Sequence, residues 1–116
     1  MTAFSTRLMR FMSINYKPSS DIVCVDSTGG VDRKGYRVFA FVVPFVTGAI
    51  PLCIGIRQDK KMDTLSKLFG MMRQCLPGYT PSCIMTDDSA AERGALTFPF
   101  PNSRLLLCQF HVSAVI

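Results

Sequence analysis

The stretch from residue 38 to residue 56 restricts the fold of this chain more than any other feature of its sequence. It reads VFAFVVPFVTGAIPLCIGI, carries no charge and approaches the length of a membrane-spanning helix. Pro44, Gly48 and Pro51 interrupt it, and it is rich in Val, Ile and Phe, which favour strands. The sequence therefore predicts two buried strands joined by a turn around residues 46–49, and no membrane-spanning helix.

The size and composition of the chain are those of one packed domain. Of its 116 residues 48% are hydrophobic and 18% are charged, which excludes a disordered tail, a collagen-like repeat and a coiled coil. The formal charge of +5 suits a polyanionic partner, although many basic proteins have none. Five cysteines without a Cys-x-x-Cys pair favour a reducing compartment over a secreted disulfide framework.

Hydrophobic periodicity predicts a definite order of strands and helices. The predicted strands cover residues 21–26, 36–43, 50–56, 81–87 and 104–107. The predicted helices extend from Met62 to Leu76, with apolar residues at three- and four-residue steps, and onward from about Ser89. We expect residues 1–20 to form a leader segment with a short helix. Residues 21–116 are expected to form one α/β domain of order βββαβαβ, a mixed sheet with helices packed on it.

Two acidic residues lie at the carboxyl ends of predicted strands. Asp26 ends the first strand and Asp87 ends the fourth. These strands are neighbours if the first hairpin grows to one side and the crossover helix returns to the other, and we predict that arrangement, with the two carboxylates within about 4 to 7 Å. Both would then reach the crevice in which open α/β sheets bind ligands, and paired carboxylates there suit Mg²⁺. The structural alternative is that Asp26 caps a turn and Asp87 caps the following helix. The spacing alone leaves both interpretations open.

Three short motifs occur in an order that resembles a known family. Asp-Ser-Thr at 26–28 ends the first strand, residues 86–93 contain the second acid, and Cys108-x-x-His111 follows the last strand. With the apolar hairpin and the Phe-Pro segment between them, these motifs resemble the amino-terminal part of the transposase domain of Mutator-like elements (MULE transposases). The resemblance extends from about Thr2 to His111.

The resemblance implies an RNase H-like fold with the three-carboxylate metal site of DDE enzymes. It makes Asp26 the first catalytic carboxylate and Asp87 the second, both holding Mg²⁺ or Mn²⁺ for the cleavage and joining of DNA strands. The family's third carboxylate is a Glu on a later helix beyond Ile116, which implies a domain truncated before its last catalytic helix. Glu92 is nearer, but the capping-box spacing of Ser89-x-x-Glu92 accounts for it.

Cys108 and His111 are a separate candidate for a structural or zinc-binding pair. They supply two of the four ligands of a structural zinc, and no other Cys or His is placed to complete the set within this chain. A packed cysteine beside a hydrogen-bonded histidine is the simpler interpretation. The resemblance also allows a metal site that later residues complete. A further departure is Gly29, which stands where many relatives have His.

The resemblance thus implies part of a DNA transposase that acts in the nucleus. Its expected partners are DNA, as transposon ends and target, with no membrane, and the resemblance allows oligomerisation. The chain alone is expected to be inactive because the third carboxylate is missing. The alternative is a domesticated or decayed relative without catalytic activity, which would serve as a DNA-binding or regulatory module or have no function. A helix-borne Glu further along the gene would favour the enzyme, and its loss would favour the regulator.

Overall fold

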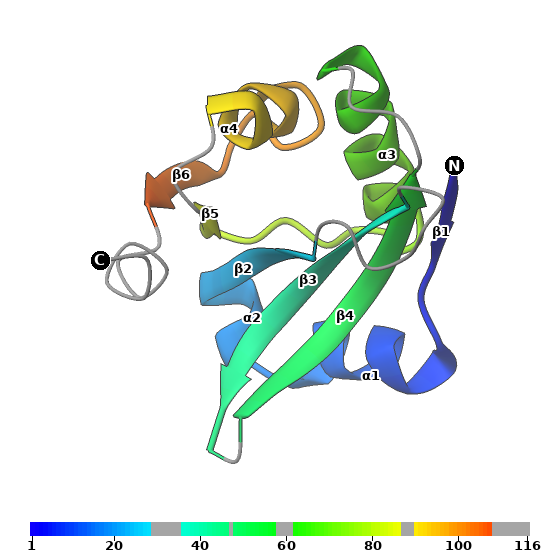
Figure 1. The fold of residues 1–116 in the computed structure, drawn as a ribbon. Helices are drawn as coiled ribbons and strands as arrows, with labels where there is room; N and C mark the ends of the chain where they lie inside the picture. The colour runs from blue at the N-terminus through cyan, green and yellow to red at the C-terminus, as the bar shows by residue number, and fades with distance from the viewer. Residues whose placement is uncertain (29–35, 47, 58–61, 87–89, 108–116) are drawn as a thin grey trace.

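A mixed six-stranded sheet organises the computed structural model, which describes residues 1–28, 36–46, 48–57, 62–86 and 90–107 (Figure 1). Its strands are β1 (Thr2–Phe4), β2 (Ile22–Thr28), β3 (Arg37–Phe45), β4 (Gly48–Arg57), β5 (Cys83–Thr86) and β6 (Arg104–Leu107). Its helices are α1 (Arg7–Asn15), α2 (Pro18–Asp21), α3 (Met62–Gln74) and α4 (Ala90–Thr97). From residue 22 onward the described elements follow the predicted order βββαβαβ.

The strand order across the sheet is β1-β4-β3-β2-β5-β6. Strands β2, β3 and β4 pair antiparallel, whereas β5 is parallel to β2 and β6 is parallel to β5. Antiparallel neighbours need only a short turn, but each parallel neighbour needs a crossover, and α3 and α4 lie in those two connections. The first and fourth predicted strands are therefore adjacent, as the sequence suggested.

The uncharged stretch forms the predicted β-hairpin of β3 and β4. Phe45 pairs with Gly48 at its tip, and the φ of Gly48 is +143°, a conformation that glycine adopts at little cost. A β-bulge at Phe41/Val42 shifts the register, and both Leu52 and Cys53 are fully buried in the facing segment of β4. No helix among the described residues is long and apolar enough to cross a membrane.

The N-terminal segment differs from the prediction in two respects. Residues 18–21 form the short helix α2, so the first predicted strand begins at Ile22 and not at residue 21. Residues 1–20 contain the expected helix α1, but they also contribute β1, which pairs antiparallel with β4. A three-residue strand is too short to show a clear alternation in the sequence, so only its pairing with β4 defines it. The hydroxyl of Ser5 donates a hydrogen bond of 2.7 Å to the carbonyl of Leu52, which further ties this segment to β4.

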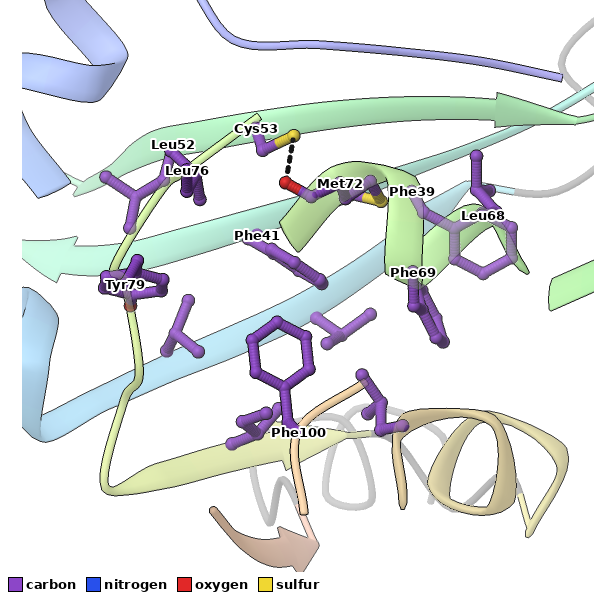
Figure 2. Packing of buried hydrophobic residues seen from close by; sticks show 14 of the residues in the cluster. Phe39, Phe41, Leu52, Cys53, Leu68, Phe69, Met72, Leu76, Tyr79 and Phe100 are labelled. Atoms are coloured by element: carbon purple, nitrogen blue, oxygen red, sulfur yellow. Dashed lines mark hydrogen bonds between the residues drawn. The ribbon is translucent and has the colours of Figure 1, made fainter. Parts of the chain in front are cut away.

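The hydrophobic core lies on one face of the sheet. Phe39 and Phe41 of β3 pack from this face against Phe69 of α3, and the ring of Phe100 packs against that of Phe41 (Figure 2). The ring centroids of Phe39 and Phe69 are 5.6 Å apart at 90°, an edge-to-face packing. The apolar stripe predicted for residues 62–76 supplies much of the core: Leu65, Leu68, Phe69 and Met72 of α3, and Leu76 beyond its end, are all buried.

The opposite face of the sheet is covered less completely. Its residues alternate with the core residues along each strand and are only half-buried; they include Cys24, Val38, Ala40, Val42, Ile54, Cys83 and Met85. Helix α1 does not cover this face, because Met12 and Tyr16 of the α1 segment pack with Ile50 against the core cluster. Asp26 shares the half-buried face, since it lies opposite Ala40 in the ladder.

Candidate metal site

The parallel pairing of β2 with β5 defines the edge of the sheet at which the candidate site lies. Ile22 pairs with Cys83 and Cys24 pairs with Met85, so the carboxyl ends of both strands point toward the same edge of the sheet. Strand β6 reaches that edge beside β5, since Thr86 pairs with Leu107. Carboxyl ends of parallel strands are the places where open α/β sheets bind ligands.

Asp26 lies on β2 two residues beyond the last β2–β5 pair, and its side chain is exposed to solvent. The prediction that the strand ends at Asp26 was wrong, because β2 continues to Thr28 through its pairing with β3. Asp87 directly follows Thr86, the last residue of β5, and lies outside the described residues. The adjacency of the two strands is confirmed. The close approach of the two carboxylates stays a prediction, since it involves Asp87.

Thr86 adds a buried polar group at the end of β5. Its side chain is fully buried, and its hydroxyl has no hydrogen-bond partner within the described part of the chain. A buried polar group left in this state costs about 1–3 kcal/mol. The sequence predicted a strand here, but it did not indicate that the Thr86 hydroxyl would be buried without a partner among the described residues. Thr86 directly precedes Asp87.

Glu92 lies in the first turn of α4 and is only 5% exposed. The capping box with Ser89 stays a prediction, because Ser89 lies outside the described residues. Among the residues that are described, no three His, Cys, Asp or Glu side chains gather in a way that could hold a metal ion.

The zinc candidates Cys108 and His111 both lie outside the described residues. Among the other cysteines, Cys24, Cys53 and Cys83 lie in strands as expected. Cys53 donates a hydrogen bond of 3.5 Å to the carbonyl of Met72 and contacts Cys75 (Figure 2 shows the first of these). Burial, and then the neighbouring Cys75 thiol, raise the pKa of Cys53 to about 12, so this thiol stays protonated at neutral pH.

Arg57 at the end of β4 is a charged residue whose burial the sequence interpretation missed. It is only 4% exposed, and its guanidinium lies over the ring of Phe39 at 5.6 Å from the centroid. The alternation of side chains along β4 could have indicated this burial, because Cys53, Gly55 and Arg57 share one face of the strand and all three are buried. A cation packed on an aromatic face is a stable arrangement for arginine.

The comparisons with known proteins agree with this architecture. The family model of the MULE transposase domain matches residues 22–115, which is most of the chain. The chain therefore belongs to the MULE transposase domain family. No protein of the curated set matches it significantly.

One solved structure shows the same fold in a distant sequence. It is a chain of the simian T-cell lymphotropic virus intasome, determined by cryo-electron microscopy in complex with the PP2A regulatory subunit B56 gamma. The TM-score is 0.54 at 17% sequence identity, with 83% of this chain covered. The match spans 36% of the intasome chain, so it supports a shared fold over part of that protein.

Proposed function

We propose that this chain is the amino-terminal part of the catalytic domain of a DDE-type DNA transposase with an RNase H-like fold. The observation that carries the proposal is the parallel pairing of β2 with β5, which brings the strand that contains Asp26 beside the strand that precedes Asp87. Membership of the MULE family and the fold shared with an intasome chain both support this proposal.

Asp26 and Asp87 are the residues that would hold Mg²⁺ or Mn²⁺. The donor set fits, because both ions prefer carboxylate oxygens and retain waters, and Asp26 is exposed on β2 where such an ion has access. When bound, the metal would supply Lewis-acid stabilisation of charge on the phosphodiester oxygens. The protein's own contribution is to hold the two carboxylates on adjacent strands.

A third carboxylate from a later helix would complete the site. The half-buried face of the sheet supports this part of the proposal, because Asp26 projects from the same face as Cys24 and Ala40, which remain partly exposed. A helix packed on that face would bury apolar surface and could bring a carboxylate to Asp26. Cleavage and strand transfer would then belong to the complete domain.

DNA is the proposed partner, as transposon ends and target, and the nucleus is the proposed location. The formal charge of +5 favours attraction of a polyanion, which would weaken as salt concentration rises. The alternative of a catalytically inactive, DNA-binding relative would keep this attraction without requiring the metal site.

Calorimetric titration of the purified chain with Mn²⁺ tests the metal site directly. We expect weak binding that is lost in both Asp26→Asn and Asp87→Asn. Asp21→Asn is the matched control, because Asp21 is an exposed acid at the end of α2 and should leave binding unchanged. Binding that persists in both site variants would contradict the proposed function.

A further inference from the structure

The outward side of α1 is apolar although it faces solvent. Leu8, Phe11 and Ile14 are 69%, 56% and 75% exposed. They follow one another at three-residue steps, so they lie along one side of the helix and form a continuous strip, here called the α1 stripe. Single exposed apolar residues are ordinary, but an aligned set of large ones is typical of an interaction surface.

A cleft of about 350 Å³ adjoins the α1 stripe. It lies between α1 and the β3–β4 hairpin, and its apolar walls include Leu8, Met9, Met12, Phe45, Ile50 and Pro51. Its volume lies at the lower end of the range for binding pockets and suits a large apolar side chain. Leu8 belongs to both the cleft and the α1 stripe, so the two form one surface.

Contacts made by its lining residues hold the walls of this cleft in place. The rings of Tyr16 and Phe45 pack edge to face with centroids 5.5 Å apart, and the Tyr16 hydroxyl donates a hydrogen bond of 3.2 Å to the carbonyl of Pro44. The side chain of Thr6 caps α1 by accepting a hydrogen bond of 3.1 Å from the Met9 N–H. The surface is therefore preformed, which lowers the entropy lost on binding.

The charges around this surface favour an acidic partner. Arg7 and Arg10 are exposed on α1, and residues 1–20 contain no Asp or Glu. The hairpin tip from residue 44 to residue 51 carries no charge that could offset these arginines. A second copy of the chain would bring the same positive charge against itself, and DNA has no apolar face to cover the α1 stripe.

We propose that the α1 stripe and the adjoining cleft dock an amphipathic helix of a partner protein. The apolar side of that helix would cover Leu8, Phe11 and Ile14 and place one large side chain in the cleft, as in other helix-in-groove complexes. Its Asp or Glu residues would lie beside Arg7 and Arg10. This surface is separate from the Asp26 edge, so the inference does not depend on the proposed metal site.

Fluorescence anisotropy with two synthetic helical peptides tests the proposal. Both peptides carry the same Leu and Phe stripe; one has flanking Glu residues and the other has Lys in their place. We expect the chain to bind the Glu peptide and not the Lys peptide. The Phe11→Ser and Arg7→Glu variants should each weaken that binding by about tenfold or more.

Two matched variants control for general effects. Phe98→Ser removes an aromatic side chain that is 87% exposed at the end of α4, and Lys67→Glu reverses an exposed charge on α3. Both should bind the Glu peptide as the parent chain does. Equal binding of the two peptides, or no loss in Phe11→Ser, would overturn the proposal. So would Phe11-dependent binding of anionic vesicles or duplex DNA in place of the peptide, or Phe11-dependent self-association in sedimentation experiments.

Discussion

Cys24 on β2 lies directly opposite Met85 on β5 in a parallel ladder. Asp26 and Asp87 each stand two residues further along the chain than one member of this pair. Parallel strands keep the same direction, so equal steps from a paired position lead toward the same edge of the sheet. This relationship links the two acids that the sequence singles out, although they are far apart along the chain.

Replacement of Thr86 by Val should stabilise the chain. The substitution keeps the branched shape but removes a fully buried hydroxyl that has no partner in the described structure. We expect the free energy of unfolding to rise by about 1 kcal/mol in urea denaturation. Thr97→Val is the control, since Thr97 is exposed on α4 and should change stability by less than about 0.5 kcal/mol. A marked loss of stability in Thr86→Val would mean that the hydroxyl is satisfied in solution.

Gly55 should not tolerate even one added methyl group. A Cβ at this position on β4 would lie 2.6 Å from Sδ of Met72 and 3.1 Å from Cδ1 of Leu68, both in the packed core. We expect Gly55→Ala to cost about 1–3 kcal/mol because the core must shift to admit it. Gly70→Ala provides the contrast: Gly70 lies within α3 with open space at its Cβ position, so this change should add up to about 1 kcal/mol. Equal effects of the two substitutions in thermal or urea unfolding would contradict the packing described for α3 on β4.

The stability of the chain should fall as the pH rises from about 9 to about 12. An unfolded Cys53 thiol loses its proton near its ordinary pKa of 9.0, whereas burial raises the pKa of the folded thiol to about 12. Between these values the unfolded chain binds fewer protons than the folded chain, so the free energy of unfolding decreases with pH. Burial also raises the pKa of Tyr79, which acts in the same direction at higher pH.

Urea denaturation at several pH values above about 8 measures this dependence. The slope should be smaller in Cys53→Ala than in the parent chain. Cys83→Ala, which alters a half-buried cysteine on β5, should keep the parent slope. A slope that is unchanged in Cys53→Ala would show that this thiol does not control the pH dependence.

The 116-residue chain by itself should not cut or join DNA. The proposed site has two carboxylates in this chain, Asp26 and Asp87, and phosphoryl transfer depends on fixed positions of metal and reacting oxygens. Incubation of supercoiled DNA with the chain and Mg²⁺ or Mn²⁺ checks this, with nicked circles as the product to measure. Nicking that both Asp26→Ala and Asp87→Ala abolish would refute the prediction and show that the fragment assembles a working site.

Much of the fold was predictable because its elements have clear periodicities. The apolar residues of α3 recur at helical spacing, and the breakers at Pro44, Gly48 and Pro51 indicated a hairpin where a membrane helix was the competing reading. The strand β1 was not predicted, because three residues carry too little pattern and its pairing with β4 depends on contacts distant in sequence.

The acidic residues of the candidate site could be identified from the sequence, but the packing of the residues around them could not. Asp26 could be placed because an apolar run precedes it, and the parallel pairing of β2 with β5 was an inference from the crossover of α3. Tertiary packing determines the burial of Glu92, the burial of the Thr86 hydroxyl without a partner among the described residues, and the contact of Cys53 with Cys75. Local sequence gives no measure of such packing.

Paramagnetic broadening by Mn²⁺ in a two-dimensional amide NMR spectrum tests the central claim most directly. If Asp26 and Asp87 hold one divalent ion, substoichiometric Mn²⁺ should broaden the amide signals of Asp26 and Thr86 and leave those of Ala49 and Ile50, at the hairpin tip, sharp. Both Asp26→Asn and Asp87→Asn should abolish the broadening, whereas Asp21→Asn should not. Broadening that is absent, spread evenly over the chain or retained in either site variant would contradict a shared metal site at the β2–β5 edge.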